Sequence, residues 1–318
     1  MKKELGIFVL LVVLCAITGF ENPRFFSQPN MINMANIIGL FGIFSLGAGI
    51  VIITSGIDLS VGSMIALIGM LLVMALTDWH WAWPLGILFV IVVSLLLGWA
   101  HGILITRFNM QPFIVTLCGL LLYRGVARFI ARDTTKGFGH AEGFKALQNL
   151  ANGKLFGLPM PFVLLIVISV IMWVVLHRST YGRYLYAVGR NEEAARFSGI
   201  NTRFVIAGSY VLAALLTGIS GILFAFYTNS VSPSTQGNFY ELYGIAAAVL
   251  GGCSLRGGEG SIIGIIIGVA LLQVLQNLVN LLGIPSSLNF AVMGAVVLIG
   301  VLADQIFQKR GQKIVRVN

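Results

Sequence analysis

Charged residues are scarce in this sequence. Aspartate, glutamate, lysine and arginine make up 10% of its 318 residues, whereas hydrophobic residues make up 58%. Soluble domains carry about 25% charged residues, and the mean hydropathy here is +0.94. The composition therefore excludes an ordinary soluble domain. It predicts an all-α integral membrane protein in which residues 1–318 form one polytopic transmembrane domain.

Cysteine and histidine are also few and scattered. Cys15, Cys118 and Cys253 lie in or beside apolar stretches without paired spacing, and the four histidines are far apart. This pattern indicates neither a disulfide framework nor a metal site. No Ser/His/Asp set in a recognisable elbow and no Gly-x-x-x-x-Gly-Lys-Ser/Thr phosphate loop occurs. We therefore predict no catalytic site, no metal and no cofactor, and the chain is not expected to be an enzyme.

Acidic residues are fewer than basic ones, 11 against 20, which gives a net charge of +9. The basic residues gather at the ends of apolar segments and in short loops, as the positive-inside rule predicts for a membrane protein. No basic helix with interleaved aromatic residues occurs, so nucleic acid is not an expected partner.

Long apolar segments predict about ten transmembrane helices. The eighth is short enough to be broken or re-entrant, and the first resembles a signal peptide but lacks a convincing cleavage site, so we predict an uncleaved first span. The expected spans are 5–20, 37–54, 60–77, 84–106, 112–130, 160–177, 204–227, 241–253, 261–282 and 288–307.

The distribution of basic residues predicts that both termini are cytoplasmic. The 177–203 loop then also lies in the cytoplasm. The inner loops and tails receive Lys2, Lys3, Arg107, Arg178, Arg183, Arg190, Arg196, Arg203, Arg256, Lys309, Arg310, Lys313 and Arg316. A basic cluster between Arg128 and Lys154 falls outside and opposes this bias. The polar, turn-rich segment 131–159 is expected to be an extracytoplasmic surface loop in preference to a lid.

A short polar helix is predicted within the cytoplasmic loop. Asn191 is a good N-cap, Glu192 and Glu193 suit the first turn, and Gly199 can end the helix in the left-handed conformation. About eight residues are too few for a helix to be stable alone in water, so it needs a surface, either the membrane or a partner protein. The stretch reads Gly189, Arg190, Asn191, Glu192, Glu193, Ala194, Ala195, Arg196, Phe197, Ser198, Gly199 and Ile200.

Asp58 and Ser60 lie between the second and third spans, at or within the membrane boundary. A carboxylate there is costly and usually has a role. It can cap the third span, which we favour, or it can contact a solute in the translocation path. Both roles are compatible at a broken helix.

Four amides occupy one face of the ninth span: Gln273, Gln276, Asn277 and Asn280, at spacings of three and four residues. Amides both donate and accept hydrogen bonds, which suits a neutral polyol better than an ion. The stripe either lines a wet path or makes hydrogen bonds between helices; the second interpretation is at least as well supported.

Glycine spacing adds two predictions. Rows such as Gly98 with Gly102 and Gly264 with Gly268 are typical of close helix packing. The glycine-rich break 251–260 resembles the break near Asp58, since Gly62-Ser63 and Gly260-Ser261 each begin an apolar segment. This similarity hints at an internal repeat, a common feature of transporters.

Three stretches, Ser55 to Gly62, Gly189 to Ile200, and Glu241 to Gly268, together resemble the ribose-type (monosaccharide) permease subunits of bacterial ATP-binding cassette importers. The resemblance covers most of the chain and is carried by the combination. The chain departs from the family pattern at Ser55, where a second glycine is usual, and at Cys253, where threonine is usual.

The resemblance implies a multi-pass protein of the bacterial inner membrane, in contact with lipid, that moves a monosaccharide such as ribose. It implies three partners: a second, commonly identical permease subunit, a cytoplasmic ATPase that hydrolyses the ATP, and an extracytoplasmic sugar-binding protein. Residues 189–200 would dock on the ATPase, where Phe197 and Ile200 could fill a groove. Asp58, Ser60 and the 273–280 amides are the candidates for the translocation path.

Other functions remain open at this point. The solute could be a branched-chain amino acid or a sugar-like signalling molecule, although the path holds few counter-charges for charged solutes. An ion-coupled secondary transporter would need carboxylates or histidines deep in the spans. A membrane scaffold would leave the amide stripe unexplained.

Overall fold

The computed structural model describes residues 2–139, 143–285 and, beyond these, 288, 291, 292, 294, 295 and 298. Most of the predicted tenth span, 288–307, and the C-terminal basic residues lie outside the described residues.

The described part of the chain folds as a helical bundle. Seven helices are long and apolar enough to cross a membrane. They are α1 (Lys2–Glu21), α2 (Gln28–Ile53), α4 (Trp83–Thr106), α5 (Pro112–Ile130), α7 (Met160–His177), α10 (Thr202–Thr228) and α12 (Ile262–Leu281). Two apolar helices are shorter, α3 (Val61–Thr77) and α11 (Tyr240–Leu250). Together these nine helices match the first nine predicted spans.

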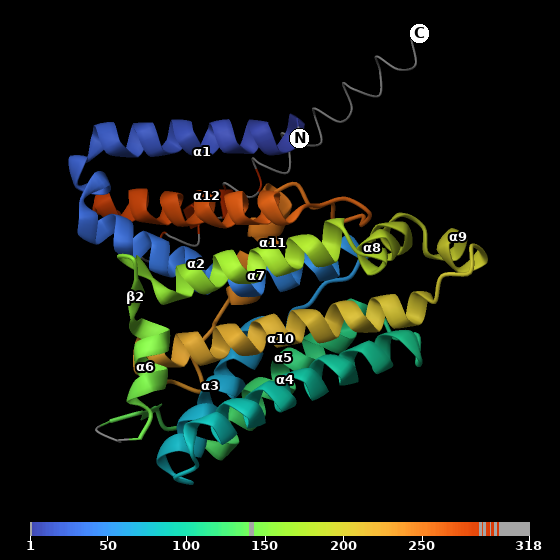
Figure 1. Ribbon diagram of the computed structural model, residues 1–318, viewed down its shortest axis with the longest axis horizontal. Helices are drawn as coiled ribbons and strands as arrows, with labels where there is room; N and C mark the ends of the chain where they lie inside the picture. The colour runs from blue at the N-terminus through green and yellow to red at the C-terminus, as the bar shows by residue number, and fades with distance from the viewer. Residues whose placement is uncertain are drawn as a thin grey trace.

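Small elements connect the spans. They are the 3-10 helix η1 (Pro23–Phe26), the helices α6 (Lys145–Asn152), α8 (Thr180–Arg190) and α9 (Glu192–Phe197), and the strands β1 (Lys136–Gly137), β2 (Lys154–Leu155), β3 (Leu158–Pro159) and β4 (Ser230–Val231). Strand β1 pairs antiparallel with β4, and β2 with β3. Figure 1 shows α9 at one end of the bundle and α6 at the other. We call these the α9 end and the α6 end; the N-terminus lies at the α9 end.

Helices α2 and α10 form the centre of the bundle. In their most apolar windows 78% and 67% of the residues are buried, against 6% in α1, which lies at the edge. Glycines permit the close packing around them. A Cβ at Gly98 would lie 2.5 Å from the Ala214 Cβ, and one at Gly268 would lie 2.1 Å from the Ala247 carbonyl oxygen. The glycine rows therefore serve helix packing, as the sequence predicts.

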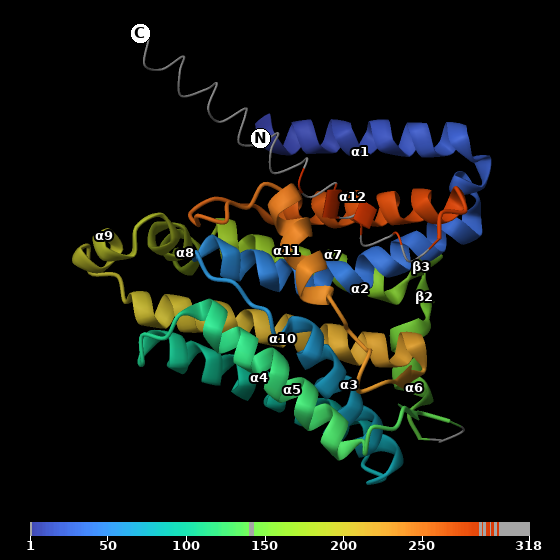
Figure 2. The same ribbon diagram turned by 180° about the vertical axis from the view of Figure 1, so that it is seen from behind.

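Helices α3 and α11 begin inside the bundle. After α2 ends, residues 54–60 turn back between the spans before α3 starts, and residues 229–239 do the same before α11 (Figures 1 and 2). The N-terminal ends of the two helices meet. A Cβ at Gly62 would lie 2.0 Å from the Gly237 carbonyl oxygen. Each of the two helices is continuous but starts inside the bundle after a non-helical segment. In this sense the eighth span is interrupted before Tyr240, as the sequence predicts, and the third span before Val61.

The second span is longer than predicted. Helix α2 begins at Gln28 and not near residue 37, with Pro29 in its first turn. Its first ten residues include Asn30, Asn33 and Asn36, which gave this stretch the composition of a loop. Proline is well tolerated in the first turn of a helix because the missing N–H would have no partner there.

The 131–159 segment is folded and is not the plain surface loop that the sequence predicts. Strand β1 pairs with β4, and α6 buries Leu147 and Ala151. The Phe138 ring stacks on Phe226 of α10, with ring centroids 4.4 Å apart. Lys136 pairs with Asp78 at the end of α3 and holds the pKa of that carboxyl below its usual value. The segment is thus a small cap fixed to the ends of α3 and α10.

The close approach of α3 and α11 predicts the effect of a single methyl group. Gly62→Ala should destabilise the protein by about 1–3 kcal/mol, because the new Cβ meets backbone that cannot move aside cheaply. Thermal unfolding in detergent measures this loss. Gly125→Ala is the matched control, since a Cβ there meets nothing within 4 Å; it should be neutral or slightly stabilising. Equal melting temperatures for the two variants would contradict the observed packing.

Candidate functional site

Helices α8 and α9 project at the α9 end of the bundle (Figure 1). The Asn191 side chain accepts a hydrogen bond of 2.9 Å from the Ala194 N–H at the start of α9. At the other end, Gly199 has a φ of +83° and the Ile200 N–H donates to the Ala195 carbonyl. This is the hydrogen-bond pattern of a Schellman C-cap. Both predicted caps are confirmed, although the helix has six residues, where about eight were expected.

The exposed residues of α9 include Glu192, Glu193, Arg196 and Phe197. The Phe197 side chain is 82% exposed, and the Arg196 guanidinium lies 5.7 Å from its ring centroid. Ala195 is buried and faces the bundle. Ile200 packs against the core of this chain. Of the two apolar residues predicted to reach a partner, Phe197 is therefore free to do so, whereas Ile200 is already engaged.

Helix α8 was missed in the sequence, where 177–203 appeared to be a loop with one short helix. Its signals were present: Ser179 caps the helix by accepting from the Gly182 N–H at 3.1 Å, and the apolar positions Leu185 and Val188 are buried. Gly189 ends α8 against the end of α2, where a Cβ would lie 1.8 Å from the Ile53 carbonyl oxygen. Glycine is required at this position for that reason.

A cavity of about 580 Å³ lies between α9 and the ends of the spans. Its walls come from α9, the start of α10, the connection between α4 and α5, and residues 54–56. Glu192, Arg196 and Arg203 supply charges to it. The cavity thus lies between α9 and the connection that enters α5.

Asp58 and Ser60 lie in the segment that leads from α2 to α3. One Asp58 carboxylate oxygen accepts from the Ser60 N–H at 2.8 Å and from the Ser60 hydroxyl at 2.7 Å. Asp58 is 5% exposed and Ser60 is fully buried. The carboxylate closes the turn just before α3, but neither Asp58 nor Ser60 makes a side-chain hydrogen bond to an N–H of α3, so the predicted N-cap is not formed. Contact with a solute stays a prediction.

Other polar groups surround this segment. The Thr116 hydroxyl donates to the Ile57 carbonyl at 3.3 Å, and the Tyr210 hydroxyl does so at 3.4 Å. His101 and Tyr123 share a hydrogen bond of 2.8 Å nearby, and Asp58 acts on both electrostatically. Residues from α4, α5 and α10 thus meet around the segment that connects α2 with α3.

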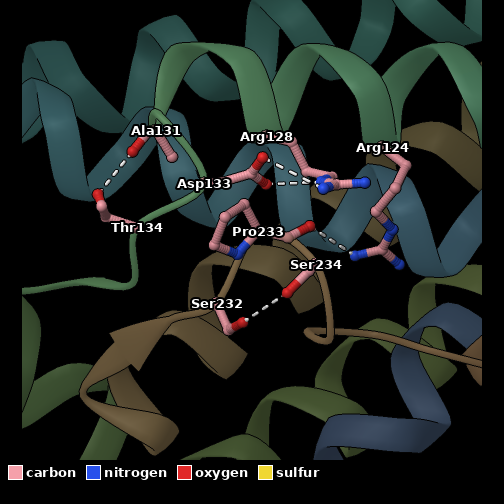
Figure 3. Close-up of polar contacts among 8 residues, drawn as sticks. All are labelled: Arg124, Arg128, Ala131, Asp133, Thr134, Ser232, Pro233 and Ser234. Carbon is pink, nitrogen blue, oxygen red and sulfur yellow. Dashed lines mark hydrogen bonds and ion pairs between the residues drawn. The ribbon is translucent and has the colours of Figure 1, made fainter.

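Glu241 and Arg124 hold the start of α11. The Glu241 carboxylate is buried in the first turn of α11 and accepts from the Gly62 N–H of α3. Arg124 of α5 donates to the Pro233 carbonyl at 3.1 Å, as Figure 3 shows, and to the Gln236 carbonyl at 2.7 Å. It also interacts electrostatically with Glu241. Figure 3 also shows the ion pair of Arg128 and Asp133, 2.6 Å apart, at the end of α5.

Sequence reasoning missed this group. It placed Glu241 near the end of a span, whereas the carboxylate lies inside the bundle because the eighth span is interrupted before it. Arg124 within the apolar run 112–130 was the available signal, since a charge in a span is usually functional. His101 within the apolar run 84–106 offered the same kind of signal, but its partner Tyr123 lies in the next span and could not be identified from spacing.

The amide stripe of α12 is largely used between helices. Gln276 donates to the Tyr243 hydroxyl of α11 at 2.9 Å, and Asn277 and Asn30 of α2 exchange two hydrogen bonds of 2.8 and 3.1 Å. Gln273 is buried, whereas Asn280 is exposed at the α6 end. The structure does not bring the stripe together with Asp58 and Ser60, since α12 packs on α1, α2, α7 and α11.

The bundle of apolar spans, the two helices that begin inside it and the exposed capped helix at one end define a multi-pass membrane permease. The chain belongs to the family described as branched-chain amino acid transport system / permease component, whose sequence profile matches residues 30–301.

Curated relatives are similar over nearly the whole chain. The ribose import permease protein RbsC of Bacillus subtilis (strain 168) is 38% identical over 95% of this chain and 93% of its own. The D-allose transport system permease protein AlsC of Escherichia coli (strain K12) is 30% identical over 96% and 92%. The fructose import permease protein FruF of Bifidobacterium longum (strain NCC 2705) is 30% identical over 92% and 84%. No solved structure gives a significant match.

The pair of Asn30 and Asn277 allows the role of the stripe to be tested. If it joins α2 and α12, Asn30→Leu and Asn277→Leu should each lower stability by about 0.6–2 kcal/mol. The double variant should lose less than the sum of the two, because the second substitution removes no further pair. Thermal unfolding in detergent measures the stability of the wild type, the two single variants and the double variant, which together form a double-mutant cycle. Additive losses would contradict the pairing of the two residues, whereas unchanged stability with impaired solute uptake would indicate that these amides act on a solute.

Proposed function

We propose that this chain is the permease subunit of an ATP-driven importer that carries a monosaccharide, ribose or a related sugar, across the bacterial inner membrane. The main support is the 38% identity to a ribose permease, which extends over 95% of the chain. Three relatives named for different sugars, ribose, allose and fructose, match at 30–38% identity. The sugar proposal is therefore preferred to an amino acid, although the family description names branched-chain amino acids.

The interior of the bundle also favours a neutral solute. A helix N-terminus inside a membrane can receive the carboxylate of a transported amino acid, because its free N–H groups and dipole attract an anion. Here the two internal N-termini already have carboxylates of this chain, Asp58 at α3 and Glu241 at α11. A solute carboxylate would have to compete with them, whereas a neutral sugar would not.

The proposed topology has ten spans and places the α9 end in the cytoplasm. The inner loops carry most of the arginines at this end, and the N-terminus shares it in Figure 1. The tenth span and the cytoplasmic position of the C-terminus rest on the sequence alone, because most of these residues lie outside the described part of the chain. The α6 end, with its cap of residues 131–159, then faces outward. In this proposal residues 1–318 form one transmembrane domain.

The proposed partners follow from this orientation. A cytoplasmic ATPase would bind α9 through contacts with Phe197, Glu192 and Glu193. A sugar-binding protein would deliver the solute to the α6 end. A second copy of the chain would complete the translocation path, with lipid around the pair. Movement of the ATPase on ATP binding would shift α9 and tilt the spans between inward-open and outward-open states.

The path itself is proposed to use Asp58 and Ser60, together with the amides of α12. Gln276 and Asn277 already bond to neighbouring helices, so Gln273 and Asn280 have more freedom to contact the solute. Neutral amide and hydroxyl groups match a polyol because each both donates and accepts hydrogen bonds.

An ion-coupled transporter is the second candidate, and one observation favours it. Asp58, His101, Arg124 and Glu241 are ionisable groups gathered inside the bundle, where an ion-coupled mechanism needs such groups. Sugar uptake that survives ATP depletion but is abolished by collapse of the ion gradient would support it. Loss of uptake on ATP depletion alone would support the importer.

Substitution of Phe197 tests the proposed contact with the ATPase. Phe197→Ala should lower sugar-stimulated ATP hydrolysis and uptake at least about tenfold, because a buried aromatic anchor contributes roughly 1.5–3 kcal/mol. Activity is measured in proteoliposomes that contain the permease, the ATPase and the loaded binding protein.

Phe129→Ala is the matched control. Phe129 is 83% exposed, against 82% for Phe197, but it lies at the α6 end of α5. This variant should retain activity. Full coupling in Phe197→Ala, or equal losses in both variants, would refute the proposed docking site.

A further inference from the structure

Three segments meet directly behind α9. They are the end of α2, the end of α8, and the glycine-rich loop 251–260 between α11 and α12. We call this contact the three-way junction and define it by Ile53, Ser55, Gly189, Arg256 and Gly258. None of these five residues belongs to α9.

The junction is a contact between backbones. The Gly258 N–H donates to the Ile53 carbonyl at 2.9 Å. A Cβ at Gly189 would lie 1.8 Å from that same carbonyl oxygen and 2.6 Å from the Gly258 nitrogen. Because no side chain lies between them, a displacement of α8 is transmitted directly to the end of α2 and to the glycine-rich loop.

Ser55 bridges the three segments. Its hydroxyl lies 3.0 Å from the Gly189 carbonyl oxygen and 2.9 Å from the Arg256 carbonyl oxygen. A serine hydroxyl has one proton, so it is shared between the two acceptors. Ser55 has a φ of +64°, an uncommon conformation for a residue with a side chain. The chain therefore tolerates local strain at the position that makes this bridge. Tyr186 of α8 adds a bond of 2.7 Å from its hydroxyl to the Gly260 carbonyl.

Two of the joined segments lead to the helices that begin inside the bundle. From Ser55 the chain passes through Asp58 and Ser60 into the start of α3. From the glycine-rich loop it leads back into the C-terminal end of α11. At their other meeting point, the start of α3 contacts the start of α11, where Glu241 accepts from the Gly62 N–H. The junction and the two internal helices thus form a closed mechanical connection.

We propose that the three-way junction is the positioning element that transmits movement of α9 to both interrupted helices. The inference rests on the proposed function, since it assumes that a partner moves α9. A push on α9 displaces the end of α8 at Gly189. The junction then moves residues 54–60 and the glycine-rich loop together, so that α3 and α11 shift as a pair.

Two glycines of the same loop provide a matched test. Gly257 has a φ of +80°, and a Cβ there would lie 2.0 Å from the Ser55 hydroxyl oxygen and 2.6 Å from the Gly189 carbonyl oxygen. Gly252 has a φ of +93°, but the atom nearest to its Cβ would be 3.9 Å away, in Ile7. Alanine strains the backbone similarly at both positions, whereas only Gly257→Ala inserts a methyl group into the junction.

The experiment uses the assembled complex of permease, ATPase and binding protein in proteoliposomes, with ribose as the probe. Gly257→Ala should lower ribose transported per ATP hydrolysed about three- to tenfold, as expected for the loss of one or two hydrogen bonds that link the segments. Basal ATP hydrolysis should persist. Gly252→Ala should transport as the wild type does.

Hydrogen exchange supplies a readout that general destabilisation would not reproduce. In the wild type, trapping the complex with ATP and orthovanadate should change the exchange of residues 55–62. This nucleotide-dependent change should disappear in Gly257→Ala and persist in Gly252→Ala. If the Gly257→Ala complex does not assemble, the same coupling measurement is made on Ser55→Gly. This substitution removes the bridging hydroxyl, and glycine readily adopts the positive φ at this position. The expected loss of coupling in Ser55→Gly is two- to threefold, roughly that of a single hydrogen bond.

Equal coupling in the two glycine variants, or wild-type coupling in Ser55→Gly when Gly257→Ala cannot be assembled, overturns the proposal. A wild-type complex that fails to import ribose would instead count against the proposed solute. In that case the hydrogen-exchange comparison still tests the junction, because it needs the ATPase and nucleotide but no solute.

Discussion

Helices α3 and α11 both begin inside the bundle, so their free backbone N–H groups need acceptors at a depth where a bilayer supplies none. Two carboxylates lie at these helix starts. Asp58 closes the turn into α3, and Glu241 accepts from the Gly62 N–H while it lies in the first turn of α11. Arg124 adds a positive charge and binds the carbonyls that precede α11. The close approach of the two helices at Gly62 and Gly237 depends on this local satisfaction of polar groups.

A second constraint acts at the α9 end. Helix α9 is capped at both ends by its own residues and exposes Phe197, so it is formed before any partner binds. Its base is joined to α2 and to the glycine-rich loop by direct backbone contacts and by the Ser55 hydroxyl. A short helix that is preformed outside and rigidly attached inside is well suited to receive a force. The internal helices, which lack the continuous hydrogen bonds of a full span, are the part of the bundle best suited to respond.

The sequence predicted the long spans well because each is an apolar run that ends at proline, glycine or charge. It predicted the caps of α9 from Asn191 and Gly199, since capping depends on neighbouring residues. It failed where the meaning of a residue depends on distant partners. The asparagines at the start of α2 have the composition of a loop, yet Asn30 pairs with Asn277 of α12. The cap at 131–159 is held by Phe226 and Asp78, which lie far away in the sequence.

Composition and periodicity by themselves determined that this is a membrane protein, where most of its helices lie, and that residues 189–200 form a capped polar helix. These properties follow from burial and from local hydrogen bonds, which a linear pattern records. Only the tertiary structure decided that the third span is interrupted as well as the eighth, that Glu241 lies inside the bundle, and that Ser55 bridges Gly189 and Arg256. Each of these depends on the hydrogen-bond partner that a distant segment brings to a backbone group, and sequence order does not encode that partner.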